Sequence, residues 1–168
     1  MNTFSYIFLG AVVFGFALQW VLTRRHINHV NEHREQVPAA FSDKIPLADH
    51  QKAADYTQAK AKTGLVELCF ATLVLLIWTL GGGLQWLDSF WREFGLSEIF
   101  TGVGFIFSAI LIGSIIDIPF SIYRTFRLEQ DFGFNKTTAS TFIIDILKNT
   151  LVLSLIGIPL LALILWIM

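Results

Sequence analysis

Residues 99–123 read IFTGVGFIFSAILIGSIIDIPFSIY, and this stretch decides the fold. Asp117 is its only charged residue. A bilayer offers no partner to free backbone N–H and C=O groups, so an apolar segment of about 20 residues crosses it as a helix. The stretch therefore predicts a transmembrane helix.

Three further segments approach the same length and apolar character, at residues 4–22, 65–87 and 150–168. The chain as a whole is 54% hydrophobic, which is too apolar for an ordinary soluble domain. We therefore predict an all-α fold, an integral-membrane bundle of four transmembrane helices with helical cytoplasmic loops, in one domain over residues 1–168. No basic residue precedes the first segment, which favours a retained span over a cleaved signal peptide.

Charge and cysteine content exclude several classes of protein. The formal net charge of −1 gives no electrostatic basis for nucleic-acid binding. Cys69 is the only cysteine, so an intramolecular disulfide and a multi-cysteine metal site are excluded. The predicted partner is the lipid bilayer, and assembly of two copies of the chain is left open.

Basic residues in the loops predict the topology, because cytoplasmic loops collect Lys and Arg. The second loop holds only Arg92. The first and third loops should therefore be cytoplasmic, with the N-terminus, the second loop and the C-terminus outside. The basic residues of the two predicted cytoplasmic loops are Arg24, Arg25, Arg34, Lys44, Lys52, Lys60 and Lys62 in the first, and Arg124, Arg127, Lys136 and Lys148 in the third.

The first loop itself should be largely helical. We expect residues 24–36 to continue the first helix until Pro38 ends it. Asp49 is the expected N-cap of a helix that runs without a breaker into the second span. The three glycines at 81–83 predict a kink or a helix end near the outer side of that span.

His26, His29 and His33 lie on one face of the predicted first helix, a spacing that allows imidazoles to share a metal ion. Residues 29–33 also match H-x-x-E-H, the pattern of inverted zinc proteases. The alternative is a polar juxtamembrane helix with histidines near lipid headgroups. No histidine is followed by Glu, so H-E-x-x-H is absent and we assign no catalytic residue and no metal ligand.

Two carboxylates lie at the cytoplasmic ends of predicted spans. An intramembrane carboxylate such as Asp117 suggests function, whereas one near the interface is simply solvated. Glu67 invites the same two interpretations. We expect both side chains at similar depth, paired with Arg124 or Lys148.

A spaced string of residues follows the third span and extends to the fourth. Its core is the turn at residues 132–136, which we expect to be structured around Gly133. It serves either as a docking element for another part of the protein or only as a cap of the next helix, started by Thr137 or Thr138. The string comprises Pro119, Tyr123, Phe126, Glu129, Gly133, Phe134, Asn135, Lys136, Asp145 and Lys148, and Lys52, Tyr56 and Lys60 form an earlier block after Pro38.

This order of blocks resembles the N-terminal membrane domain of the type I CAAX prenyl proteases, over almost the whole chain. The resemblance implies a seven-span zinc metalloendopeptidase with a water-filled intramembrane chamber. It also implies that the zinc site lies downstream of the region present here, on the cytoplasmic side. The expectation is a domain that forms part of the chamber, supports a separate catalytic portion, is inactive alone and holds no cofactor of its own.

Two other functions remain open from the residues alone. One is a non-enzymatic four-helix membrane scaffold or partner protein. The other is a small transporter subunit.

Overall fold

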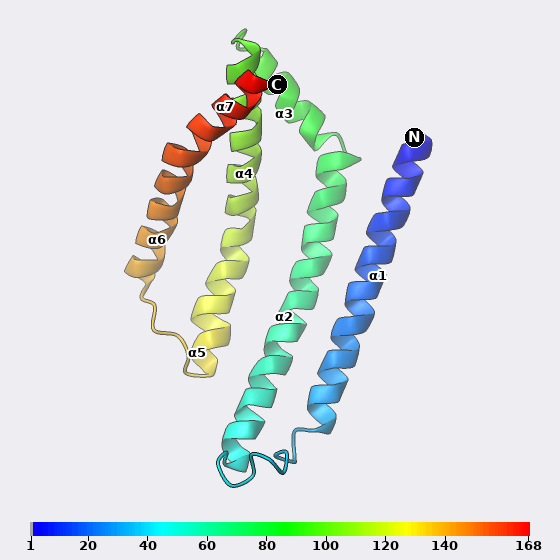
Figure 1. Ribbon diagram of the computed structural model, residues 1–168, viewed down its shortest axis with the longest axis vertical. Helices are drawn as coiled ribbons and strands as arrows, with labels where there is room; N and C mark the ends of the chain where they lie inside the picture. Colours follow the sequence, from blue (N-terminus) through cyan, green and yellow to red (C-terminus); the bar gives the residue numbers. More distant parts are fainter. Residues whose placement is uncertain (1) are drawn as a thin grey trace.

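The computed structural model describes residues 2–168, and these residues fold into helices with no strand among them (Figure 1). Two π-helical segments, Arg124–Leu128 and Leu153–Gly157, join α4 to α5 and α6 to α7. The α-helices are α1 (Thr3–Glu32), α2 (Leu47–Thr79), α3 (Gly83–Arg92), α4 (Glu98–Tyr123), α5 (Glu129–Asp131), α6 (Ala139–Val152) and α7 (Ile158–Ile167).

Four continuous helical rods are long and apolar enough to cross a membrane, which confirms the prediction of four spans. They are Thr3–Glu32, Leu47–Thr79, Glu98–Asp131 and Ala139–Ile167. All four begin or end well beyond the predicted apolar segments, because more polar helix extends each of them. Both termini lie at the end of the bundle where α3 lies, opposite the loop between α1 and α2 (Figure 1).

The first loop differs in detail from the expectation. α1 ends at Glu32, four residues early, because the chain turns there and brings Arg34 against α2. Asp49 is not the N-cap of α2: Pro46 precedes the first turn, and Asp49 lies inside it. Proline has no N–H to leave unsatisfied at a helix start, and an acidic residue in the first turn favours the helix dipole.

The triple glycine ends α2, as predicted. Gly82 has a φ of 81°, a left-handed conformation that a residue with a Cβ rarely adopts. The second span therefore ends at Thr79 rather than at residue 87, and α3 follows as a separate short helix.

Prolines shape the other two long rods without ending them. Pro119 lies inside α4, and helix continues past the predicted end at residue 123 as far as Asp131. The π-helical segment Leu153–Gly157 ends two residues before Pro159 in α7. A wider turn relieves the clash between a proline ring and the carbonyl four residues earlier.

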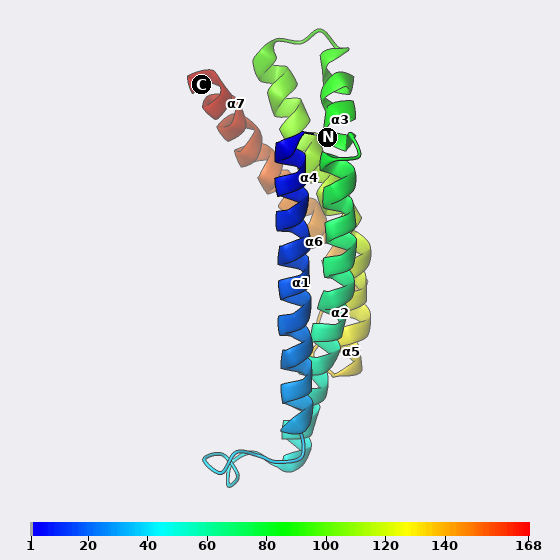
Figure 2. The ribbon, with the colours of Figure 1, turned by 90° about the vertical axis from the view of Figure 1, so that its right-hand side faces the viewer.

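The bundle is open, with a very small buried core. α1 packs along α2, and both views show them side by side (Figures 1 and 2). α4 packs against α3 and α7. Most apolar side chains therefore face outward, toward lipid or other helices. The buried residues are Ala54, Leu65, Leu87, Thr101, Val103 and Leu128.

Candidate functional site

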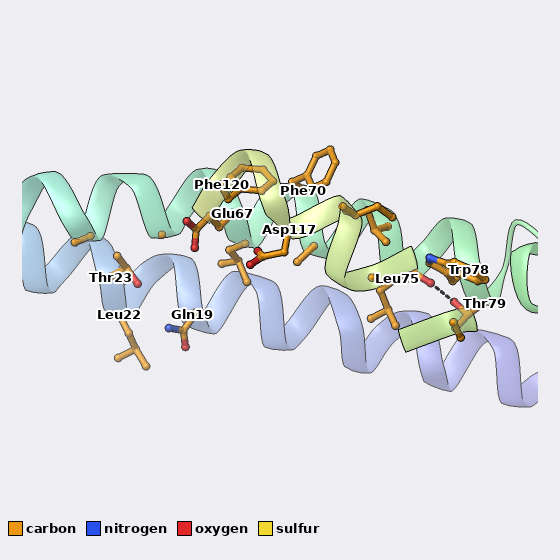
Figure 3. A pocket seen from close by; sticks show the side chains of 18 of the residues that line it. Gln19, Leu22, Thr23, Glu67, Phe70, Leu75, Trp78, Thr79, Asp117 and Phe120 are labelled. Atoms are coloured by element: carbon orange, nitrogen blue, oxygen red, sulfur yellow. Dashed lines mark hydrogen bonds between the residues drawn. The ribbon is translucent and has the colours of Figure 1, made fainter. Parts of the chain in front are cut away.

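A cleft of about 1340 Å³ lies between α1, α2 and α4 (Figure 3). Most of its lining is apolar, including Phe70, Leu75 and Phe120. A few polar side chains interrupt this lining, and they come from all three helices. These polar residues are Gln19, Thr23 and His26 from α1, Glu67 and Thr79 from α2, and Asp117 from α4.

A charged network closes one part of the cleft. Arg124 Nη1 donates to Glu67 Oε2 at 3.0 Å, and Arg124 Nη2 donates to Asp117 Oδ2 at 3.1 Å. Ser121 Oγ accepts from Arg124 Nη2 and donates to Asp117 Oδ2, each at 3.1 Å. The network joins α2 to the end of α4. The two carboxylates therefore share one partner, and that partner is Arg124 rather than Lys148.

Within residues 2–168, the network leaves one carboxylate oxygen without a partner and the other carboxylate exposed. Glu67 Oε1 is buried and has no hydrogen-bond partner among the described residues. Asp117 is 57% exposed in its side chain. A buried carboxylate oxygen without a partner is costly, so this site favours a water molecule or an N–H donor. The arrangement therefore places an exposed carboxylate, Asp117, among apolar walls, and the described residues of the cleft include no nucleophile activated by a base.

The turn at residues 132–136, which we call the aromatic turn, is held by its own backbone. The Glu129 carbonyl accepts from the backbone N–H groups of Phe134 and Asn135 at 2.8 and 3.2 Å. Gly133 has a φ of 75°, so the turn requires glycine there. Asn135 Oδ1 accepts from the Thr137 backbone N–H at 2.7 Å.

The aromatic turn docks on the polar end of α2. Tyr56 makes edge-to-face contacts with Phe132 and Phe134, with ring centroids 5.3 and 4.9 Å apart. Lys52 Nζ lies 5.3 Å from the Phe134 ring centroid, and Lys60 Nζ lies 5.9 Å from that of Tyr56. The three α2 residues are spaced four apart, so they share one helix face. Two blocks that lie about 80 residues apart in the sequence therefore form one cluster, although Phe134 is still 49% exposed.

Several other residues of the string make contacts apart from this cluster. Pro119 and Tyr123 line a smaller cavity of about 540 Å³ between α2 and α4. Phe126 packs against Phe142 of α6, with ring centroids 5.4 Å apart. Thr138, one of the two predicted starts of α6, is its N-cap and accepts from the Thr141 backbone N–H at 3.2 Å.

Three predicted residues are not drawn into any cluster. Lys136, Asp145 and Lys148 make no ion pair within residues 2–168. The spacing of Asp145 and Lys148 would permit a pair, but exposed pairs contribute little. Both are consistent with a solvated helix face.

The three candidate histidines of α1 do not form a set of three. The rings of His29 and His33 are close, with centroids 4.2 Å apart, and Glu32 lies with them. His26 lies outside this group; it lines the cleft and also, with His29 and Glu32, a smaller hollow. His50 Nε2 donates to the His33 carbonyl at 2.9 Å.

One contact was not apparent from the sequence. Arg34 donates from Nε and Nη2 to the two carboxylate oxygens of Asp55, at 2.7 and 2.9 Å. This bond, together with a second bond to Glu35, raises the pKa of the Arg34 guanidinium above its ordinary range. Helical spacing could not predict this pair, because Arg34 and Asp55 are 21 residues apart and a loop lies between them. Ser121, in contrast, lies four residues after Asp117 on the same face of α4, a signal that was available.

Comparison with known proteins agrees with the resemblance seen in the sequence. Residues 26–168 match the family described as the CAAX prenyl protease N-terminal domain with five membrane helices. The chain is 31% identical over 147 residues to a probable CAAX prenyl protease 1 of Schizosaccharomyces pombe, covering 80% of this chain and 31% of the relative. It is 28% identical over 162 residues to CAAX prenyl protease 1 of Saccharomyces cerevisiae, covering 90% and 35%.

The fold has a solved counterpart. The crystal structure of S. mikatae Ste24p superposes with a TM-score of 0.85 at 24% identity, over 97% of this chain and 39% of that one. The chain thus spans about a third of the length of the curated relatives it matches. Among the described residues, four helices are long and apolar enough to span a membrane, whereas the family description gives five membrane helices. The chain belongs to the CAAX prenyl protease family, within its N-terminal membrane domain.

Proposed function

We propose that this chain is the membrane domain of a CAAX-prenyl-protease-like zinc metalloendopeptidase. It forms part of the wall of an intramembrane chamber and supports a catalytic portion supplied by other residues. The observation that carries this proposal is the cleft between α1, α2 and α4, in which Glu67 and Asp117 interrupt apolar walls. Ionisable groups inside a membrane bundle mark cavities that hold water or substrate.

The catalytic zinc of such an enzyme does not fit the residues present. H-E-x-x-H places two imidazoles and a general base on one helix face, and this sequence lacks it. The described residues do bring together His29, Glu32 and His33, but this group is exposed at the end of α1. None of its members lines the cleft, so no hydrolytic step is assigned to it.

Activity of the isolated chain provides the first test. The purified chain in detergent should not hydrolyse a prenylated CAAX peptide, with or without added zinc. Chelator-sensitive hydrolysis that disappears in His29→Ala or His33→Ala would refute the proposal and make the inverted motif catalytic.

Assembly provides the second test. The C-terminal region of the S. cerevisiae relative, supplied as a separate chain, should co-purify with this chain and gain peptide hydrolysis. Phe134→Ala and Asn135→Ala should weaken assembly if the aromatic turn contacts the catalytic portion. If the chain is well folded but does not assemble with the C-terminal region, the scaffold function is favoured. If both variants assemble as well as the wild type, the aromatic turn serves only as a helix cap.

The same proposal includes an orientation. The N-terminus, α3 and the C-terminus lie outside, and the loop after α1 and the aromatic turn are cytoplasmic, because these two loops carry most of the basic residues. Reporters after Met168 and near Ser89 should both read outside. Cytoplasmic signals from both would reverse the orientation.

A further inference from the structure

The last turns of α1 bring three metal-ligating side chains together, separately from the cleft. One ligand atom each from His29, Glu32 and His33 lies within 4.8 Å of the other two. Ligands bonded at about 2.0–2.2 Å around zinc stand a little over 3 Å apart, so small side-chain rotations close the remaining gap. We propose that these three residues bind one zinc ion, with water completing the coordination.

The hydrogen bonds around His33 prepare it to ligate. Its Nδ1 lies 2.8 Å from the His29 carbonyl oxygen, which can only accept, so Nδ1 carries the proton. This fixes the tautomer and leaves the lone pair on Nε2. A backbone carbonyl bonded to the second ring nitrogen is the usual support of a metal-bound histidine.

The carboxylate and the surroundings also suit an ion. Glu32 makes no ion pair within residues 2–168, so its charge is not already neutralised. His29 and Glu32, together with His26, line a hollow of about 510 Å³ that has room for water ligands. Arg25 lines the same hollow and opposes a cation, which lowers the affinity without blocking the site.

The site lies where α1 is fastened to α2. His50 of α2 donates to the His33 carbonyl, and the next residue, Arg34, is bonded to Asp55. A metal ion that bridges His29 and His33 would hold the last turn of α1 in helical form next to these bonds. The site therefore couples metal binding to order at the α1–α2 junction.

Titration of the full chain tests the proposal. The tag-free, metal-stripped protein in detergent is titrated with ZnCl₂ by calorimetry, and with Co²⁺ by visible absorption. We expect one ion per chain, and at least about tenfold weaker binding in His29→Ala, His33→Ala and Glu32→Gln. All three side chains are exposed, so circular dichroism should show unchanged helix content.

A matched control lies one turn earlier on the same helix. His26 lines the same hollow, but its ring is not among the three grouped ligands, so His26→Ala should leave the affinity nearly unchanged. The proposal is overturned by the absence of saturable binding, by equal binding in a His29→Ala/His33→Ala double variant, or by an equal loss in His26→Ala. Unchanged affinity in Glu32→Gln would overturn the three-ligand site.

Discussion

Replacing Arg124 by glutamine tests whether the charged network holds α4 to α2. The change keeps a polar side chain but removes the cation that pairs with both Glu67 and Asp117. Glu67 would then have no partner for either carboxylate oxygen, since Oε1 has none in the intact network. We expect a loss of stability that comes mainly from Glu67, because its side chain is only 24% exposed.

The geometry sets the size of the effect. Two unit charges about 4 Å apart attract by about 4 kcal/mol at an effective dielectric constant of about 20, before desolvation is subtracted. Arg124 is 39% exposed, so screening and desolvation reduce its net coupling to Glu67 to about 1–2 kcal/mol. Asp117 is 57% exposed, and its coupling to Arg124 should be nearer about 0.5 kcal/mol.

A double-mutant cycle measures these couplings directly. Wild type, Glu67→Gln, Arg124→Gln and the double variant are unfolded with sodium dodecyl sulfate in mixed micelles and followed by tryptophan fluorescence. A parallel cycle on Asp88 and Arg92, an exposed pair 2.7 Å apart within α3, is the matched control. The reasoning fails if the Glu67–Arg124 coupling is no larger than that of this control pair.

Three further predictions concern the turn and the loop. Gly133→Ala should destabilise the protein by about 1 kcal/mol, because alanine is disfavoured in the left-handed backbone of this turn even though its Cβ would have space. The control is Gly113→Ala, at a helical position where a Cβ also has space, and it should not destabilise the protein. Thermal unfolding compares the two variants. Tyr56→Ala removes both edge-to-face contacts and should increase cleavage of the aromatic turn under limited proteolysis, while helix content stays constant. Asp55→Asn should speed hydrogen exchange at the C-terminal end of α1, because Arg34 loses its charged partner; unchanged exchange would show that the loop is held in another way.

The transmembrane spans could be predicted from the sequence, because apolar segments in a membrane must satisfy their backbone hydrogen bonds internally and so form helices. Four spans and the break at Gly82 followed from that physics. Helix ends were less predictable. The predicted span 99–123 runs through Pro119, which α4 tolerates, but the helix continues past residue 123, where no local signal marks an end. The start of α2 at Leu47 depended on Pro46 rather than on the nearby Asp49.

The candidate site was predictable only in part, for a similar reason. Depth in the membrane predicted a basic partner for the two carboxylates but left Arg124 and Lys148 open, and the structure shows Arg124 paired with both. The contact of the aromatic turn with Tyr56 joins residues far apart in the sequence, and helical periodicity cannot predict such a contact. Helical spacing aligned His26 with His29 and His33, and the structure adds a ligand group that spacing of histidines does not reveal, in which Glu32 lies with His29 and His33.

These contacts attach α2 at two separate points to the segment that follows α4. Tyr56, with its lysine neighbours, holds the aromatic turn, and Glu67, about 16 Å further along the helix, holds Arg124. The π-helical segment between these two points is the least regular part of the rod, and π turns accompany functional sites in many helices. With both ends fixed to one rigid helix, the turn cannot shift relative to the cleft unless that segment rewinds. If the turn contacts a catalytic portion, loss of either hold should therefore weaken assembly, and loss of both should weaken it by more than either alone.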